Sequence, residues 1–150
     1  MKKEFLFDLV SSSIRLGLGG LFVFASIDKI ASPEAFTQSI INYRIITNAF
    51  VAGIFAFVLP WTELVAGCAL ILNVYRRGSA LIIAMCLFVF IIAIAQGMIR
   101  NLDISCGCFT QDPGAAKIGV FKLLEDLFLL SLAIFMVLSP SPGWRNWRTR

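Results

Sequence analysis

Two cysteines separated by one glycine, Cys106-Gly107-Cys108, carry the clearest chemistry in this sequence. In an oxidising compartment, thiols this close form a disulfide readily. The ring would be strained, because favoured disulfides hold their Cα atoms about 5.5–6 Å apart, and Gly107 supplies the backbone freedom that such a ring requires. Strained and exposed disulfides have more oxidising potentials than structural ones. The spacing therefore favours thiol-disulfide exchange over a static bridge.

The alternatives for this pair are a loop staple and a metal site. A bridge between near neighbours closes almost no loop, so it removes little entropy from the unfolded chain. Two thiolates are half of a tetrahedral zinc site, and the sequence has no histidine to complete it. We therefore predict no metal site within one chain. Cys68 and Cys86 lie inside apolar stretches and are interpreted as packing residues, with a part in redox chemistry left open.

Glu63 is a second candidate site, because it lies inside an apolar stretch just after Pro60-Trp61. A carboxyl group at bilayer depth is costly, and by default it indicates a functional site. We weigh a proton path or quinone head-group site equally against structural bonding between helices. Its candidate partners are Arg15 and Lys29, and protonation is the alternative to pairing.

Other charged residues flank the apolar stretches. We interpret Lys29 as a solvated or paired helix end, and the spacing of Lys122 and Asp126 predicts an ion pair one helical turn apart. A sharper hypothesis is that Lys117 or Lys122 approaches the cysteines and stabilises a thiolate.

The composition indicates the environment of these residues. Of 150 residues, 59% are hydrophobic and 15% charged, against about 45–50% and about 25% in soluble domains. A core of this size cannot bury that excess, so lipid must solvate it. The net charge is +4, but the basic residues are scattered or flank apolar runs, which argues against nucleic-acid binding. We predict a membrane protein whose principal partner is the lipid bilayer.

Four apolar stretches must position the candidate residues, at about 9–31, 49–72, 78–97 and 119–138. Each is long enough to cross a hydrocarbon core of about 30 Å as a helix, and helix satisfies every backbone group there. We predict an all-α, four-helix transmembrane bundle that forms a single domain over residues 1–150. The first stretch is expected to be a retained span, because Arg15 interrupts it and Lys29 stands where a signal cleavage site needs a small residue.

The distribution of basic residues predicts the orientation in a bacterial inner membrane. Both termini are expected to be cytoplasmic, with residues 140–150 as a basic cytoplasmic tail. The loops at 32–48 and 98–118 then face the periplasm. The cytoplasmic side holds the larger group of basic residues: Lys2, Lys3, Arg15, Arg76, Arg77, Arg145, Arg148 and Arg150.

The first of these loops contains the signals of a short helix. Ser32-Pro33-Glu34 is typical of a helix start, with a capping residue, a proline in the first turn and an acid near the positive end of the dipole. Phe36, Ile40 and Tyr43 follow at helical spacing. We predict a short interfacial helix that lies on the outer membrane surface.

Small residues in the first span predict close helix packing. Gly17, Gly19 and Gly20, with Ser13 one turn earlier, are expected to let a neighbouring backbone approach. We assign them packing and no chemistry.

Three segments together carry a family resemblance. They are Phe24-Ala25-Ser26-Ile27-Asp28-Lys29-Ile30, Leu59-Pro60-Trp61-Thr62-Glu63-Leu64 and Ile104-Ser105-Cys106-Gly107-Cys108-Phe109. In this order they resemble the methylamine-utilisation MauE family and its DoxX-like relatives, over nearly the whole chain. The resemblance implies a redox-associated protein with four spans, in which Cys106 and Cys108 are the thiol pair and Glu63 is the membrane carboxylate. It also implies a periplasmic thioredoxin-like partner or a disulfide-bearing client.

We therefore carry three hypotheses. The first is a candidate thiol-disulfide oxidoreductase component that supports maturation of, or electron supply to, a periplasmic partner through Cys106 and Cys108. The second is a non-catalytic membrane scaffold in which the cysteines are incidental. The third is a quinone-linked subunit that uses Glu63.

Overall fold

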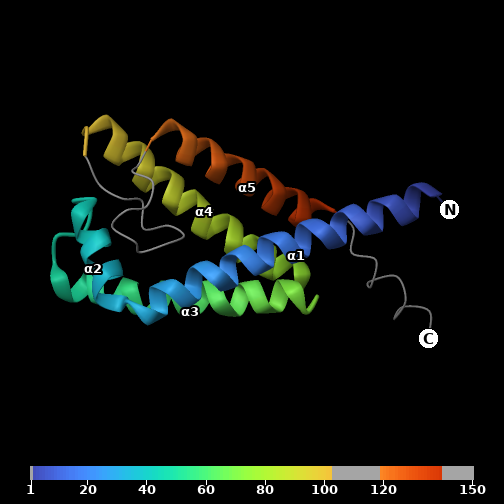
Figure 1. The fold of residues 1–150 in the computed structure, drawn as a ribbon, viewed down its shortest axis with the longest axis horizontal. Helices are drawn as coiled ribbons and strands as arrows, with labels where there is room; N and C mark the ends of the chain where they lie inside the picture. Colours follow the sequence, from blue (N-terminus) through green and yellow to red (C-terminus); the bar gives the residue numbers. More distant parts are fainter. Residues whose placement is uncertain (1, 103–118, 140–150) are drawn as a thin grey trace.

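Five helices, and no strands, make up the part of the chain that the structure describes. The computed structural model describes residues 2–102 and 119–139. The helices are α1 (Lys2–Ala31), α2 (Pro33–Asn42), α3 (Ala49–Ile71), α4 (Arg76–Ile99) and α5 (Val120–Leu138) (Figure 1). The all-α prediction is confirmed for these residues.

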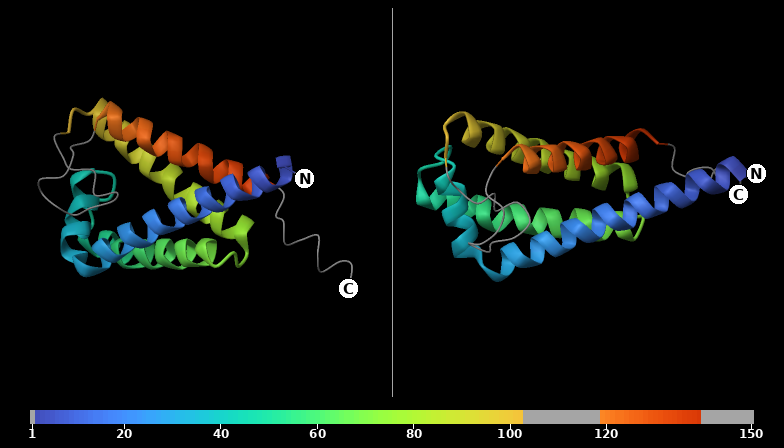
Figure 2. Two further views of the ribbon diagram at one scale, coloured as in Figure 1. Left: turned by 45° about the vertical axis from the view of Figure 1, so that its right-hand side comes forward. Right: turned by 45° about the horizontal axis from the view of Figure 1, so that its top comes forward.

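The four long helices run along the longest axis of the molecule, and α2 lies across one end (Figure 1). In the views of Figures 1 and 2, α1 lies beside α3 and α4 lies beside α5, and α3 also contacts α2 and α4. We call the two ends the α2 end and the N-terminal end. The α2 end holds the last turn of α1, the first turns of α3 and α5, and the last turn of α4.

Three of the helices are long and apolar enough to cross a membrane: Leu6–Ala31 of α1, then α3 and α4. The shorter helix α5 covers the fourth predicted span. It differs because three charged residues, Lys122, Glu125 and Asp126, lie in its first two turns. A fourth crossing therefore stays a prediction.

Hydrophobic side chains cover the outside of the bundle as well as its core. Phe22, Leu70 and Ile83 are fully buried between helices, whereas Phe24 on α1 is 70% exposed and Phe121 on α5 is 92% exposed. Apolar surface on this scale is unfavourable in water and favourable in lipid. The distribution agrees with a membrane protein.

The closest approach of α1 and α3 is at Gly19 and Gly67. A Cβ atom added at Gly67 would lie 2.9 Å from the carbonyl oxygen of Gly19, whereas additions at Gly17 and Gly20 would meet nothing within 4 Å. Glycine is needed at this crossing because backbone atoms fill the space of a side chain. The predicted close approach is confirmed for Gly19 and is wrong for Gly17 and Gly20.

The short helix α2 begins at Pro33, as the sequence predicts. Ser32 is its N-cap residue and Glu34 lies in its first turn, although the Ser32 side chain makes no capping hydrogen bond. Phe36 and Tyr43 are buried, and both line a pocket together with Ile40. The helix thus turns its predicted apolar face toward the bundle.

Candidate functional site

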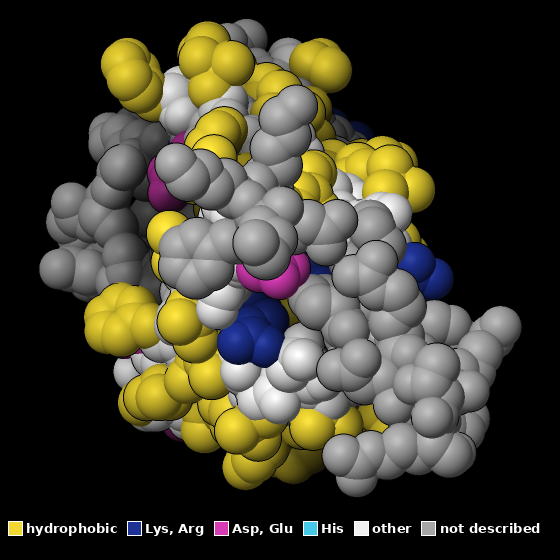
Figure 3. Space-filling model, turned by 90° about the vertical axis from the view of Figure 1, so that its right-hand side faces the viewer, with side chains coloured by type: hydrophobic (Ala, Val, Ile, Leu, Met, Phe, Trp, Pro, Cys, Tyr) yellow, Lys and Arg dark blue, Asp and Glu magenta, His cyan; other side chains and the backbone are white. Residues whose placement is uncertain are grey.

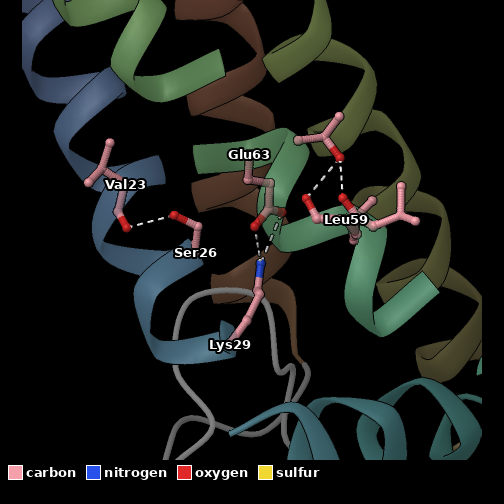
Figure 4. A network of polar contacts seen from close by, with 7 residues as sticks. Val23, Ser26, Lys29, Leu59 and Glu63 are labelled. Carbon is pink, nitrogen blue, oxygen red and sulfur yellow. Dashed lines mark hydrogen bonds and ion pairs between the residues drawn. The ribbon is translucent and has the colours of Figure 1, made fainter. Parts of the chain in front are cut away.

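A buried ion pair joins α1 and α3 near the α2 end. Lys29 Nζ donates to both carboxylate oxygens of Glu63, at 2.8 and 3.0 Å, and both side chains are fully buried (Figure 4). Of the two candidate partners of Glu63, Lys29 is the one observed. Of the two alternatives for Lys29, a paired helix end is confirmed and a solvated one is wrong, because the side chain points into the bundle and is removed from solvent.

The geometry of the two helices explains why these side chains meet. From the Gly19–Gly67 contact, Lys29 lies about 15 Å along α1 and Glu63 about 6 Å along α3, both toward the α2 end. Lys29 and Glu63 are therefore about 9 Å apart along the direction of the helix axes. Side chains tilt toward the N-terminus of their own helix, and α1 and α3 run in opposite directions. Lys29 and Glu63 therefore lean toward each other and close the gap (Figure 4).

Two aromatic rings complete the surroundings of the Lys29 ammonium group. Its Nζ lies 5.3 Å from the ring centroid of Phe36 on α2 and 4.7 Å from that of Phe90 on α4. The negative face of a ring attracts a cation, more strongly when both are shielded from water. Four helices, α1 to α4, thus meet at one amino group.

Asp126 on α5 is a further buried carboxylate in this region. It is fully buried, and neither of its carboxylate oxygens has a hydrogen-bond partner among the described residues. It lies close enough to Lys29 and Tyr43 to interact with both electrostatically. The predicted Lys122–Asp126 ion pair is wrong, because Lys122 Nζ contacts Glu125 Oε2 at 2.8 Å instead.

The burial of Asp126 was not predicted, although the sequence holds a signal for it. Asp126 shares its face of α5 with the buried residues Leu129, Ala133 and Met136. This spacing is that of the buried side of a helix. The nearby Lys122 led instead to the prediction of an ion pair one helical turn away.

The charges in this buried cluster, which we define as Lys29, Glu63 and Asp126, do not cancel. One ammonium group faces two carboxyl groups, which leaves a charge of −1 when all three are ionised. A buried uncompensated charge is costly unless a proton or a cation neutralises it. The buried cluster is therefore suited to hold one proton.

Tyr43 adds a hydrogen-bonding group beside the buried cluster. Burial raises the pKa of the Tyr43 phenol above its ordinary value, and the nearby Asp126 carboxylate raises it further. The phenol therefore keeps its proton at neutral pH and remains a hydrogen-bond donor.

An apolar pocket opens next to the buried cluster, between α2, α3 and α4. Its volume is about 360 Å³, and three phenylalanines (Phe36, Phe55 and Phe90) line it together with Tyr43 and Gln96. Phe36 and Phe90 thus separate the pocket from the Lys29 ammonium group. A largely apolar pocket with a few polar groups is typical of a site for a small hydrophobic ligand.

The cysteines differ in their positions. Cys86 is buried in the core near Glu63 and Lys29, which agrees with the packing interpretation. Cys68 is exposed on α3, so packing inside this chain does not explain it. Cys106 and Cys108, the predicted redox pair, lie outside the described residues, as does Lys117.

The fold of the described residues and the buried cluster define a helical membrane protein whose helices α1 and α3 are joined by a buried ion pair. The chain belongs to the family described as methylamine utilisation protein MauE, which matches residues 7–139. The resemblance inferred from the sequence is therefore confirmed at the family level.

Two curated relatives carry that same name. The one from Methylophilus methylotrophus is 32% identical over 117 residues, which cover 77% of this chain and 61% of the relative. The one from Paracoccus denitrificans is 28% identical over 127 residues, which cover 84% of this chain and 67% of the relative. The chain thus matches about three-fifths to two-thirds of their lengths. No solved structure matches it.

Proposed function

We propose that this chain is an inner-membrane redox protein of methylamine utilisation, which exchanges a disulfide through Cys106 and Cys108 with a periplasmic thioredoxin-like partner or client. The observation that carries the proposal is the Cys-Gly-Cys sequence in a chain of the MauE family. A structural observation supports it. The described residues that flank this segment, Leu102 and Gly119, lie at the α2 end, which is also the end of the buried cluster (Figure 1).

The exchange needs only the two cysteines and the partner's disulfide. One thiolate attacks a partner sulfur, so that a mixed disulfide forms and one partner thiolate leaves. The second cysteine then displaces the remaining partner sulfur and closes the Cys106–Cys108 disulfide. Two electrons pass to the partner, which leaves as a dithiol after it takes up two protons. The same steps in reverse oxidise a partner dithiol.

The buried cluster supports this function by fixing the helices that carry the α2 end. Lys29 joins α1 to α3 and contacts rings on α2 and α4, and Asp126 brings α5 next to them. A site that exchanges disulfides repeatedly needs a support whose geometry is held by packed elements. The cluster also offers carboxyl groups that can hold a proton.

We expect the Cys106→Ser, Cys108→Ser double variant to reduce partner thiol-disulfide exchange to the background rate. The single variant that keeps the attacking cysteine should accumulate a mixed disulfide, because the resolving thiol is missing. The measurement is thiol trapping of the partner in cells that express each variant. Cys68→Ser, which removes an exposed thiol on α3, is the matched control and should exchange at the wild-type rate. Full exchange by the double variant would instead favour the scaffold function.

A second candidate, a quinone-linked subunit, is favoured by the apolar pocket beside the buried cluster. A quinone accepts two electrons and two protons. The ring-lined pocket of about 360 Å³ fits a flat hydrophobic head group, and Ser39, Tyr43 and Gln96 are polar residues of its lining. The Lys29 amine, which is bonded to Glu63, lies next to two of these rings, and the carboxyl groups of the buried cluster can hold the protons.

Filling the pocket tests this candidate. Ala93 lines the pocket, so Ala93→Trp should reduce the quinone that copurifies with the protein at least tenfold. Met85→Trp is the matched control, because Met85 is an exposed residue of the same helix outside the pocket lining, and it should leave the quinone content unchanged. The quinone content is measured by solvent extraction and chromatography. Equal content in both variants, or none in the wild type, argues against a quinone site and leaves the thiol proposal standing.

A further inference from the structure

A polar pocket lies at the N-terminal end, opposite the buried cluster. It has a volume of about 190 Å³, and residues of α1 line it together with the α3–α4 turn and the start of α4: Asp8, Ser11, Ser12, Arg15, Asn73 and Arg76. This volume greatly exceeds the roughly 10–15 Å³ that a single water needs. The proposed thiol exchange does not require this pocket, and no residue of the buried cluster lines it.

Arg76 is a buried guanidinium group with an unused donor. It is only 6% exposed, and its Nη2 donates to the hydroxyl oxygens of Ser11, at 2.9 Å, and Ser139. Its Nε has no hydrogen-bond partner among the described residues, and the same is true of the buried Nε of Arg15. A buried donor without an acceptor costs free energy. Two unused guanidinium donors at one pocket indicate a missing acceptor.

The charges around the pocket favour an anion as that acceptor. Its lining has two guanidinium groups and one carboxylate, Asp8, which gives a net charge of +1. Arg77 lies close enough to Arg76 to add to the positive field. Arg76 also begins α4, whose N-cap residue Tyr75 supplies no side-chain acceptor. The positive end of the helix dipole therefore reinforces the field at this end.

We propose that this pocket binds a phosphate-type anion, with Arg15 and Arg76 donating to its oxygens. The guanidinium fork matches a phosphate group, and a net charge of +1 is balanced by one phosphodiester monoanion. Figure 3 views this end and shows basic and acidic side chains near its middle, with hydrophobic side chains around them. Such a face lies where lipid head groups meet a membrane protein. The head group of an anionic phospholipid and free inorganic phosphate share this chemistry.

The test adds ligands to the purified chain of residues 1–150 in a neutral detergent and follows its thermal unfolding. Phosphatidylglycerol should raise the unfolding temperature, and phosphatidylcholine, which carries no net charge, should raise it far less. Arg15→Gln should weaken the apparent affinity for phosphatidylglycerol by about tenfold, because one charge-assisted contact is lost. Asp8→Asn should strengthen it severalfold, since the repelling carboxylate is removed. Asp8 is exposed, so this variant tests the site even where an arginine variant unfolds.

A further variant and a second ligand separate the remaining outcomes. Arg100→Gln removes a positive charge at the α2 end and should leave phosphatidylglycerol binding unchanged. Stabilisation by phosphatidylglycerol alone assigns a lipid head group, whereas stabilisation by inorganic phosphate alone, weakened in Arg15→Gln, assigns a soluble anion. Equal stabilisation by the two lipids would overturn the proposal. So would unchanged affinity in both Arg15→Gln and Asp8→Asn.

Discussion

Replacing Lys29 with methionine is expected to lower the free energy of unfolding by about 3–5 kcal/mol, because the variant leaves the Glu63 carboxylate buried without its cation. Both side chains are fully buried, and both carboxylate oxygens accept from the Lys29 amine. Methionine keeps most of the side-chain length, so the loss reports the charge rather than a cavity. The measurement is reversible unfolding in mixed micelles, with the wild type beside the variant.

Two further variants identify the cause of that loss. The double variant Lys29→Met, Glu63→Leu should recover most of the stability, because the uncompensated charge is gone. Glu125→Gln breaks the ion pair of Lys122 with a half-exposed carboxylate, and it should cost only about 0–1 kcal/mol. A double variant that is no more stable than Lys29→Met alone would show that the loss arises from packing and not from charge.

Gly67→Ala is expected to destabilise the fold by about 1–3 kcal/mol, because the new methyl group would overpack the α1–α3 crossing. Its Cβ would lie 2.9 Å from the carbonyl oxygen of Gly19 and 3.2 Å from the backbone nitrogen of Val23. These are main-chain atoms, so one helix must move to admit the methyl group. The same unfolding measurement gives the size of the effect.

The matched control for this variant should change stability in the opposite direction. Gly17→Ala lies in the same helix pair, and its Cβ would meet nothing within 4 Å. Alanine favours helix over glycine, so Gly17→Ala should stabilise the protein by about 0.5–1 kcal/mol. Equal destabilisation by both variants would contradict the prediction, because a Cβ at position 17 meets no atom that could be overpacked.

Much of the fold was predictable because it depends on local patterns. The observed helices cover the predicted apolar stretches, and α2 begins at Pro33 where capping and dipole signals coincide. Such signals act within one turn of helix, so a sequence displays them directly. The family was predictable as well, because each of its three segments is an unbroken stretch of sequence and the three occur in a fixed order.

Contacts between helices were harder to predict, because they depend on which face of each helix is buried. Asp126 and Lys122 are one turn apart, yet Asp126 is on the buried face of α5 and the Lys122 amine contacts Glu125. Gly17, Gly19 and Gly20 are neighbours in sequence, yet of these Gly19 alone meets α3 closely. A rotation of one residue, about 100° around the helix axis, separates packed positions from open ones.

The sequence by itself determined that this chain is an all-helical membrane protein of the MauE family and that Glu63 is a costly carboxylate in need of a partner. Only the tertiary structure decided which partner. The start of α3 and the end of α1 both lie at the α2 end. Glu63 lies about 21 Å from the start of α3, whereas Arg15 lies about 24 Å and Lys29 about 3 Å from the end of α1. If these two helix ends were level, Arg15 and not Lys29 would lie at the depth of Glu63. The Gly19–Gly67 contact offsets α1 and α3 by about 9 Å along their axes. Because side chains tilt toward the N-terminus of their own helix, the Glu63 side chain points toward Lys29 and away from Arg15.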